Sequence, residues 1–171
     1  ALLFSLMLLC ACVASAQGIP FLENYTPDDY QAHNRNFDIV TTDDGSVFVA
    51  NFEGLLYYNN VDWQMIHTPG ITRITVVYKD KNNDIWTGGY NYIGRIQRKT
   101  NGELYLQSIG KKGAFRGEVQ EIWEEKDGVI NFLVNDGNIY EINNNQLHVK
   151  KQISKERLTI GLSDVVNVNE L

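Results

Sequence analysis

The feature that most limits how this chain can fold is a unit of about forty residues that occurs three times. Asp44-Gly45 and Asp127-Gly128 lie 83 residues apart, and Asn83-Asp84 lies close to the midpoint between them. Each pair is a turn signal between two short segments of apolar, β-branched and aromatic residues. The flanking segments are 37–40 and 47–50, 74–78 and 85–87, and 119–123 and 129–134. Each unit is therefore predicted to begin with a β-hairpin.

The second half of the unit repeats as well. A glycine leads the third apolar segment, and the three glycines are spaced by 40 and 43 residues: Gly54, Gly94 and Gly137. Tight turns of Asn and Gly separate the third segment from a fourth, at 59–60, 101–102 and 144–145. Four short strands joined by residues that tolerate positive φ are typical of a β-propeller blade.

The fourth segment of each unit carries an aromatic ring, at Trp63, Tyr105 and His148. Because the position repeats, we expect its structural role to repeat, namely filling the space between adjacent sheets. The sequence therefore assigns Trp63 to the blade core and not to a ligand site.

After the apolar residues 1–16, the chain is predicted to be all-β, because no stretch shows sustained helical periodicity. An antiparallel β-sandwich also uses many short strands, but the internal repeat favours a propeller. Residues 37–153 then form about three four-stranded blades, and Arg157 to Leu171 is interpreted as the start of a fourth. Such an arc does not close, so we expect the chain to continue beyond Leu171 and this piece not to fold stably alone.

Residues 1–16 are predicted to be a signal peptide that is truncated at its N-terminus. The segment is uncharged and apolar and ends in Ala14-Ser15-Ala16, an A-x-A site that predicts cleavage after Ala16. Lipidation of Cys12 is the alternative, because Leu9-Cys10-Ala11-Cys12 resembles a weak lipoprotein signal. We therefore predict export, with 17–36 as a lead-in segment and 37–171 as a partial propeller sensor domain.

Composition excludes several classes of partner and site. The formal charge of −6 is interspersed along the chain, so no basic patch suggests that this segment binds nucleic acid. Both cysteines lie in the leader, so the cleaved chain is predicted to have no disulfide and no Cys-based zinc site.

No combination of side chains predicts catalysis, a cofactor or a metal. The three histidines are far apart in the chain: His33, His67 and His148. Asp80-x-Asn82-x-Asp84 resembles half of a calcium loop, but Ile85 replaces the next glycine, so a polar β-turn is favoured. Gly88-Gly89 is followed by neither a lysine nor a helix, which excludes a phosphate loop.

Aromatic residues at a strand end are the candidate ligand contacts. Tyr90, Asn91 and Tyr92 lie in the link between two strands of the second unit, where propellers commonly display side chains that face a ligand. Aromatic rings with amides around them suit carbohydrate stacking. Trp86, close by, is expected to pack between blades instead.

The opening segment resembles Bacteroidota two-component regulator propellers. The resemblance lies in 18–26, 29–30 and 32–37, and the blade motif agrees at 50–58 and at Ile85-Trp86-Thr87-Gly88-Gly89. The resemblance implies a sensor on the periplasmic face of the inner membrane that responds to a carbohydrate or an envelope protein. It also implies a downstream membrane anchor, a histidine kinase or helix-turn-helix output, and pairing as a homodimer.

Two alternatives from other classes stay open. A secreted propeller enzyme acting on carbohydrate would need paired carboxylates or a His or Tyr base on the central face. A propeller that serves only as an interaction scaffold would need no small ligand.

Overall fold

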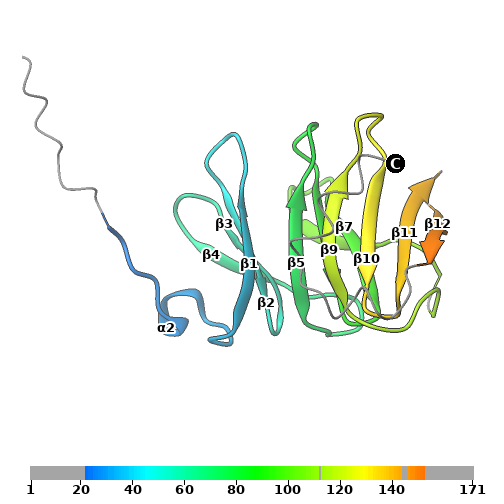
Figure 1. Cartoon of the computed structure of the whole chain (residues 1–171). Helices are drawn as coiled ribbons and strands as arrows, with labels where there is room; N and C mark the ends of the chain where they lie inside the picture. The colour runs from blue at the N-terminus through cyan, green and yellow to red at the C-terminus, as the bar shows by residue number, and fades with distance from the viewer. Residues whose placement is uncertain (1–21, 112, 144–145, 153–171) are drawn as a thin grey trace, which may run out of the picture.

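The computed structural model describes residues 22–111, 113–143 and 146–152, and these are almost entirely β-strands (Figure 1). A single turn of helix, α2 (Pro27–Tyr30), precedes them. The strands are β1 (Asn36–Thr41), β2 (Val47–Asn51), β3 (Gly54–Tyr58), β4 (Trp63–Ile66), β5 (Ile74–Lys79), β6 (Ile85–Gly89), β7 (Tyr92–Arg98), β8 (Leu104–Ser108), β9 (Val119–Glu124), β10 (Ile130–Val134), β11 (Asn138–Asn143) and β12 (Gln146–Gln152). The predicted signal peptide with Cys12, and the predicted fourth blade from Arg157, lie outside the described residues.

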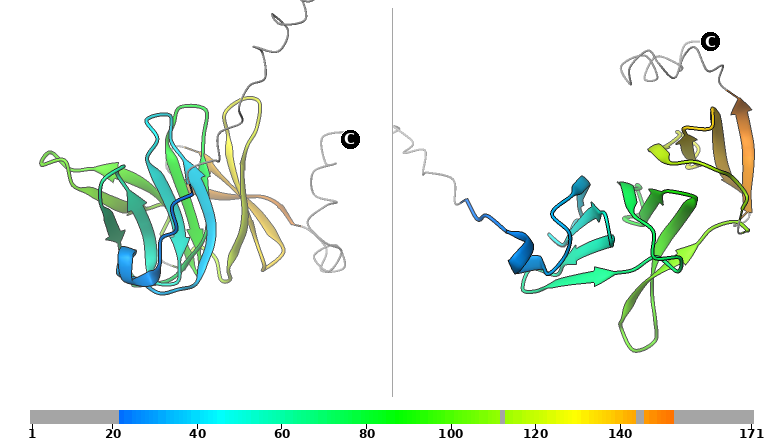
Figure 2. Two further views of the ribbon diagram at one scale, coloured as in Figure 1. Left: turned by 90° about the vertical axis from the view of Figure 1, so that its left-hand side faces the viewer. Right: turned by 90° about the horizontal axis from the view of Figure 1, so that it is seen from below.

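The strands form three antiparallel sheets of four, each built from strands that follow one another in the chain. The right-hand view of Figure 2 shows the three sheets side by side in an arc. The first strands, β1, β5 and β9, form that inner edge, where neighbouring sheets approach each other. The molecule is therefore an all-β partial β-propeller, as the repeat predicted.

The turn between the first two strands has the same hydrogen bonds in every sheet. In the first sheet the Gly45 N–H donates to the Thr42 carbonyl at 2.9 Å, and the same bond recurs in the 80–83 and 125–128 turns. The last residue of this four-residue turn has positive φ in all three sheets: Gly45 (84°), Asn83 (67°) and Gly128 (89°). Among residues with a side chain, Asn adopts this conformation more often than most. The structure thus aligns Asp44-Gly45 with Asn82-Asn83, one residue from the alignment expected with Asn83-Asp84.

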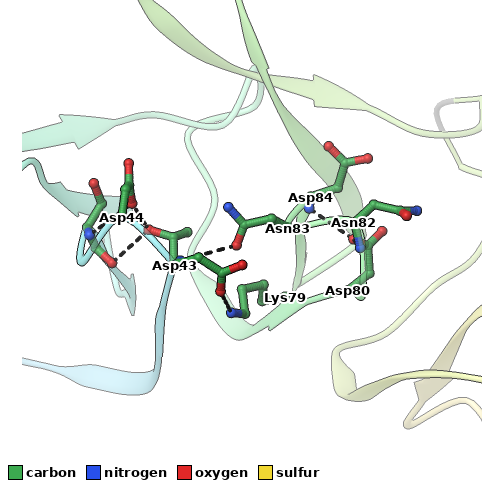
Figure 3. A network of polar contacts seen from close by, with 9 residues as sticks. Asp43, Asp44, Lys79, Asp80, Asn82, Asn83 and Asp84 are labelled. Atoms are coloured by element: carbon green, nitrogen blue, oxygen red, sulfur yellow. Dashed lines mark hydrogen bonds and ion pairs between the residues drawn. The ribbon is translucent and has the colours of Figure 1, made fainter.

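Ion pairs join the first two of these turns to the next sheet. Lys79 at the end of β5 lies 2.6 Å from Asp43 in the turn of the first sheet, as Figure 3 shows. Glu124 at the end of β9 lies 3.0 Å from Lys81 in the turn of the second sheet. The two pairs join equivalent positions with the signs reversed. Each pair includes at least one well-exposed side chain and contributes little stability by itself, although it connects a turn to the inner strand of the next sheet.

Apolar side chains fill both spaces between the sheets. Successive residues of β6 point to opposite faces, so Ile85 packs toward the first sheet and Trp86 toward the third. The inner strands are also bonded through side chains: Asp38 accepts the Val77 N–H at 3.0 Å, and the Thr75 hydroxyl donates to the Val119 carbonyl at 2.9 Å. Trp86 is 6% exposed, and its predicted place between blades is confirmed.

Two equivalences drawn from the sequence are wrong by one or two residues. The pairs Asn51↔Gly54 and Gly89↔Tyr92 align Gly54 with Tyr92, so Gly94 lies inside β7 and does not lead it. In the outer strands, Trp63 aligns with Leu106 and Leu147, and not with Tyr105 and His148. The pairs that show this are Tyr58↔Trp63, Ile96↔Leu106 and Ile142↔Leu147.

The Trp63 position does repeat as a packing position, although with a different partner in the first sheet. Leu106 and Leu147 each pack toward the preceding sheet. Trp63 instead packs against the lead-in segment, with its ring 5.3 Å from Tyr25 and 5.9 Å from Tyr30 between centroids. The expectation that Trp63 fills a space between adjacent sheets is therefore corrected: the lead-in takes the place of a preceding sheet.

Candidate ligand site at the inner edge

Three equivalent positions bring charged side chains together at one end of the inner strands. Arg35, Arg73 and Glu118 each directly precede an inner strand, at β1, β5 and β9. With their neighbours they line a cavity of about 470 Å³. We call the charged, aromatic and amide residues of its lining the inner-edge site: Arg35, Phe37, Phe52, Arg73, Glu118 and Gln120.

Asn51 holds the first part of this site in place. Its side chain is fully buried, and its amide nitrogen donates to the His33 carbonyl at 2.6 Å and to the Asn36 side chain at 2.7 Å. Its amide oxygen accepts the Glu53 N–H at 3.0 Å. One side chain therefore connects the segment that carries Arg35 to the β2–β3 turn that carries Phe52.

The Arg35 guanidinium lies over two aromatic rings, 5.5 Å from the centroid of Phe37 and 5.6 Å from that of Phe52. This cation–π contact restrains the guanidinium without neutralising its charge. Within the described residues, Arg35 forms no ion pair. Arg35 therefore offers an oriented cation to the cavity.

Arg73 is paired, although only through one nitrogen. Its Nε donates to Glu118 Oε1 at 2.6 Å, and this bond raises the pKa of Arg73. The guanidinium also lies 5.5 Å from the centroid of the Tyr90 ring. The side chain therefore keeps its charge and is held between a carboxylate and a ring, while its terminal nitrogens are not used by Glu118.

The three residues predicted to contact a ligand have different environments. Tyr90 is 49% exposed and borders the inner-edge site through Arg73. Asn91 accepts the Gly117 N–H at 2.8 Å and donates its own N–H to the Gly117 carbonyl at 2.7 Å, so it positions the loop before Glu118. Tyr92 is 6% exposed among apolar side chains of the first two sheets, and burial raises the pKa of its phenol. A ligand role stays a prediction for all three, and of the two tyrosine rings only that of Tyr90 is exposed.

The predicted polar β-turn at 80–84 is present and uses the Asp80 carboxylate fully. Asp80 accepts the N–H groups of Asn82 and Asp84 at 2.8 and 2.9 Å and the indole N–H of Trp86 at 2.9 Å (Figure 3 shows the turn).

Over the part of the chain that the structure describes, no three His, Cys, Asp or Glu side chains are grouped to hold a metal. No helix within the same ranges is long and apolar enough to span a membrane.

Sequence reasoning missed Arg35, Arg73 and Glu118. The signal that could have found them is positional, since each charged residue stands immediately before the first strand of its unit. The separations are 38 and 45 residues. They differ mainly because the hairpin of β7 and β8 is longer than the hairpin of β3 and β4. Without the strand registers, these residues could not be recognised as equivalent.

Replacing Asn51 with alanine is expected to lower the free energy of unfolding by about 1–3 kcal/mol, because backbone groups of His33 and Glu53 lose buried partners. The substitution should also weaken the binding of any ligand that contacts Arg35 and Phe52. Urea unfolding would measure the first effect, with Asn82→Ala, at an exposed turn position, as the matched control. A stability of Asn51→Ala equal to that of the control would contradict this role.

Comparison with solved structures shows the fold of this chain. The chain is similar to virginiamycin B lyase from Staphylococcus aureus, with a TM-score of 0.51 and 18% sequence identity. The match covers 67% of this chain and 40% of that protein, so this chain spans less than half the length of the neighbour. At this identity the likeness supports a β-propeller fold alone. No protein-family model and no curated protein matches the sequence.

Proposed function

We propose that this chain is the ligand-sensing propeller of an exported, membrane-spanning regulator, and that the inner-edge site holds the ligand. The observation that carries the proposal is a cavity of about 470 Å³ in which aromatic rings stand beside charged and amide side chains. Cavities of this size and mixture suit small ligands with polar groups around an apolar face. A saccharide has this character, because its ring face stacks on aromatic rings while its hydroxyls form hydrogen bonds.

The exposed aromatic rings beside the cavity come from two turns between second and third strands, and the Phe52 ring already contacts Arg35 and His33. Phe52 and Tyr90 occupy equivalent positions in the first two sheets and are 38% and 49% exposed. Gln120 lines the cavity from the third sheet and supplies an amide for hydroxyl groups. A ligand that bridges these elements would bind three sheets at once, so its binding would change how they pack. That change is the signal we propose is relayed to the membrane.

The signalling part of the proposal rests on the resemblance of 18–37 to regulator propellers. Export rests on residues 1–16, with cleavage after Ala16. An enzymatic function would need a base or a carboxylate pair beside the cavity, whereas the carboxylate of Glu118 is bound to Arg73. The lyase name of the structural neighbour belongs to that protein, and the shared fold does not transfer its activity.

Binding by the purified full-length protein tests the ligand role. Calorimetry with galactotriose and trigalacturonate should detect binding of at least one, and Tyr90→Ala should weaken it about tenfold by removing a stacking surface. Tyr90→Ala should leave the melting temperature nearly unchanged, since the ring is half exposed. Tyr105→Ala, on the outer strand β8, is the control and should bind as the wild type does.

Two results would count against the proposed function. Cleavage of trigalacturonate by the protein would indicate the enzyme alternative. A gene that encodes neither a membrane-spanning helix nor a kinase or helix-turn-helix segment after Leu171 would remove the signalling role and favour a scaffold.

A further inference from the structure

The charges around the inner-edge site do not cancel within the described residues. Equivalent positions before β1, β5 and β9 supply two arginines and one glutamate. Glu118 neutralises Arg73, and Arg35 is left as a net positive charge in a chain whose formal charge is −6. A cation that a protein keeps oriented and unpaired beside a cavity is suited to an anionic group of a ligand.

The geometry of both arginines fits such a group. Arg35 is restrained by Phe37 and Phe52, so less conformational entropy is lost when it forms hydrogen bonds. Arg73 uses Nε for Glu118 and retains its terminal N–H donors, which can form a fork with a carboxylate. The half-exposed Tyr90 ring beside the Arg73 guanidinium provides a stacking surface for the remainder of the ligand, whereas the Phe52 ring already contacts Arg35 and His33.

We propose that the inner-edge site binds a saccharide that carries a carboxylate, with Arg35 as the principal anion ligand and Arg73 as the second. Glu118 opposes binding through its charge and at the same time orients Arg73. This inference rests on the proposed function, because it names the chemical class of the ligand for the same site.

The test uses purified full-length protein and three probes: trigalacturonate, galactotriose, and galactotriose that carries sulfate. We expect trigalacturonate to bind most tightly, and its affinity to fall as salt is raised, because the contact is charge-assisted. Arg35→Gln should lower the affinity for trigalacturonate about 10–100-fold, the loss expected when a hydrogen-bonded charge pair is removed. Arg35→Lys should be intermediate, since an ammonium keeps the charge and loses the fork.

Glu118→Gln separates an electrostatic role from a structural one. The amide can still accept the Arg73 Nε–H, while the opposing charge is removed, so trigalacturonate should bind severalfold more tightly. If Glu118 only orients Arg73, trigalacturonate should bind no more tightly than it does to the wild type. Arg98→Gln is the matched control, because Arg98 is exposed and bonds the Gly102 carbonyl away from this site; its affinity should equal that of the wild type.

Each remaining outcome decides between the two proposals. If galactotriose binds as tightly as trigalacturonate and Arg35→Gln changes neither, the carboxylate inference fails and the saccharide site stands. Binding of the sulfated sugar alone would contradict the carboxylate and assign a sulfate. If no probe binds to protein that melts cooperatively, the inference and the proposed function both fail.

Discussion

Replacing Trp86 with alanine is expected to lower the free energy of unfolding by about 3–5 kcal/mol, the usual cost of truncating a buried aromatic residue. The indole is 6% exposed between the second and third sheets, where it meets Phe132 edge-on at 6.3 Å. Its N–H donates to Asp80 at 2.9 Å, and the Arg95 guanidinium lies 5.2 Å from its ring. The change therefore creates a cavity and leaves a turn carboxylate without one partner.

This loss is a large part of the total stability of a typical domain, about 5–15 kcal/mol. Urea unfolding of the full-length protein, followed by circular dichroism, would measure it. Trp63→Ala is the informative comparison, because Trp63 packs under Tyr25 and Tyr30 of the lead-in segment and not between two sheets. Trp63→Ala should cost less and should speed proteolysis within residues 22–32. If Trp86→Ala and Trp63→Ala lower the free energy of unfolding equally, the two tryptophans do not differ in environment as described.

Adding a side chain at Gly88 is expected to separate the second and third sheets. A Cβ atom there would lie 2.5 Å from a methyl carbon of Val119 and 2.6 Å from its Cβ, far inside van der Waals contact. Val119 is 1% exposed and belongs to the inner strand β9, so it has little room to move. Overpacking of this kind typically costs about 1–3 kcal/mol for a small side chain. Gly88→Val should cost more than Gly88→Ala.

A double-mutant cycle tests the cause of this loss. Val119→Ala should destabilise the wild type by removing buried methyl groups, yet it should recover part of the stability lost in Gly88→Ala. Gly70→Ala is the control, because a Cβ at Gly70 meets only a methyl of Thr72 at 3.4 Å. Strictly additive losses in Gly88→Ala and Val119→Ala would mean that the two positions do not press on each other.

The Gly88 position also explains a pattern that the sequence left without a reason. Ala50 occupies the equivalent position in the first sheet, where it too is fully buried against the next sheet. The Gly88-Gly89 pair was excluded as a phosphate loop from the sequence, and the structure supplies the positive reason for the first of these glycines. A small residue there allows the inner strand of the following sheet to approach.

Local chemistry in the sequence was enough to determine the class of fold. Turn residues such as Gly45, Asn83 and Gly128 act through their own φ angles, and strand alternation acts over a few residues, so both are visible without a structure. Repetition of these signals predicted three four-stranded units with the hairpin of each unit first. The structure has those units in that order.

Register and the inner-edge site were decided only by the tertiary structure. A one-residue shift in a strand moves a side chain to the other face, and the pattern of apolar and turn residues does not show how many residues a turn or bulge takes up. Trp63 was therefore matched with Tyr105, although the paired strands align it with Leu106. Arg35, Arg73 and Glu118 lie 38 and 45 residues apart in the chain. They share one cavity only because stacked sheets place the starts of their inner strands side by side, which is a property of packing between units and not of any unit alone.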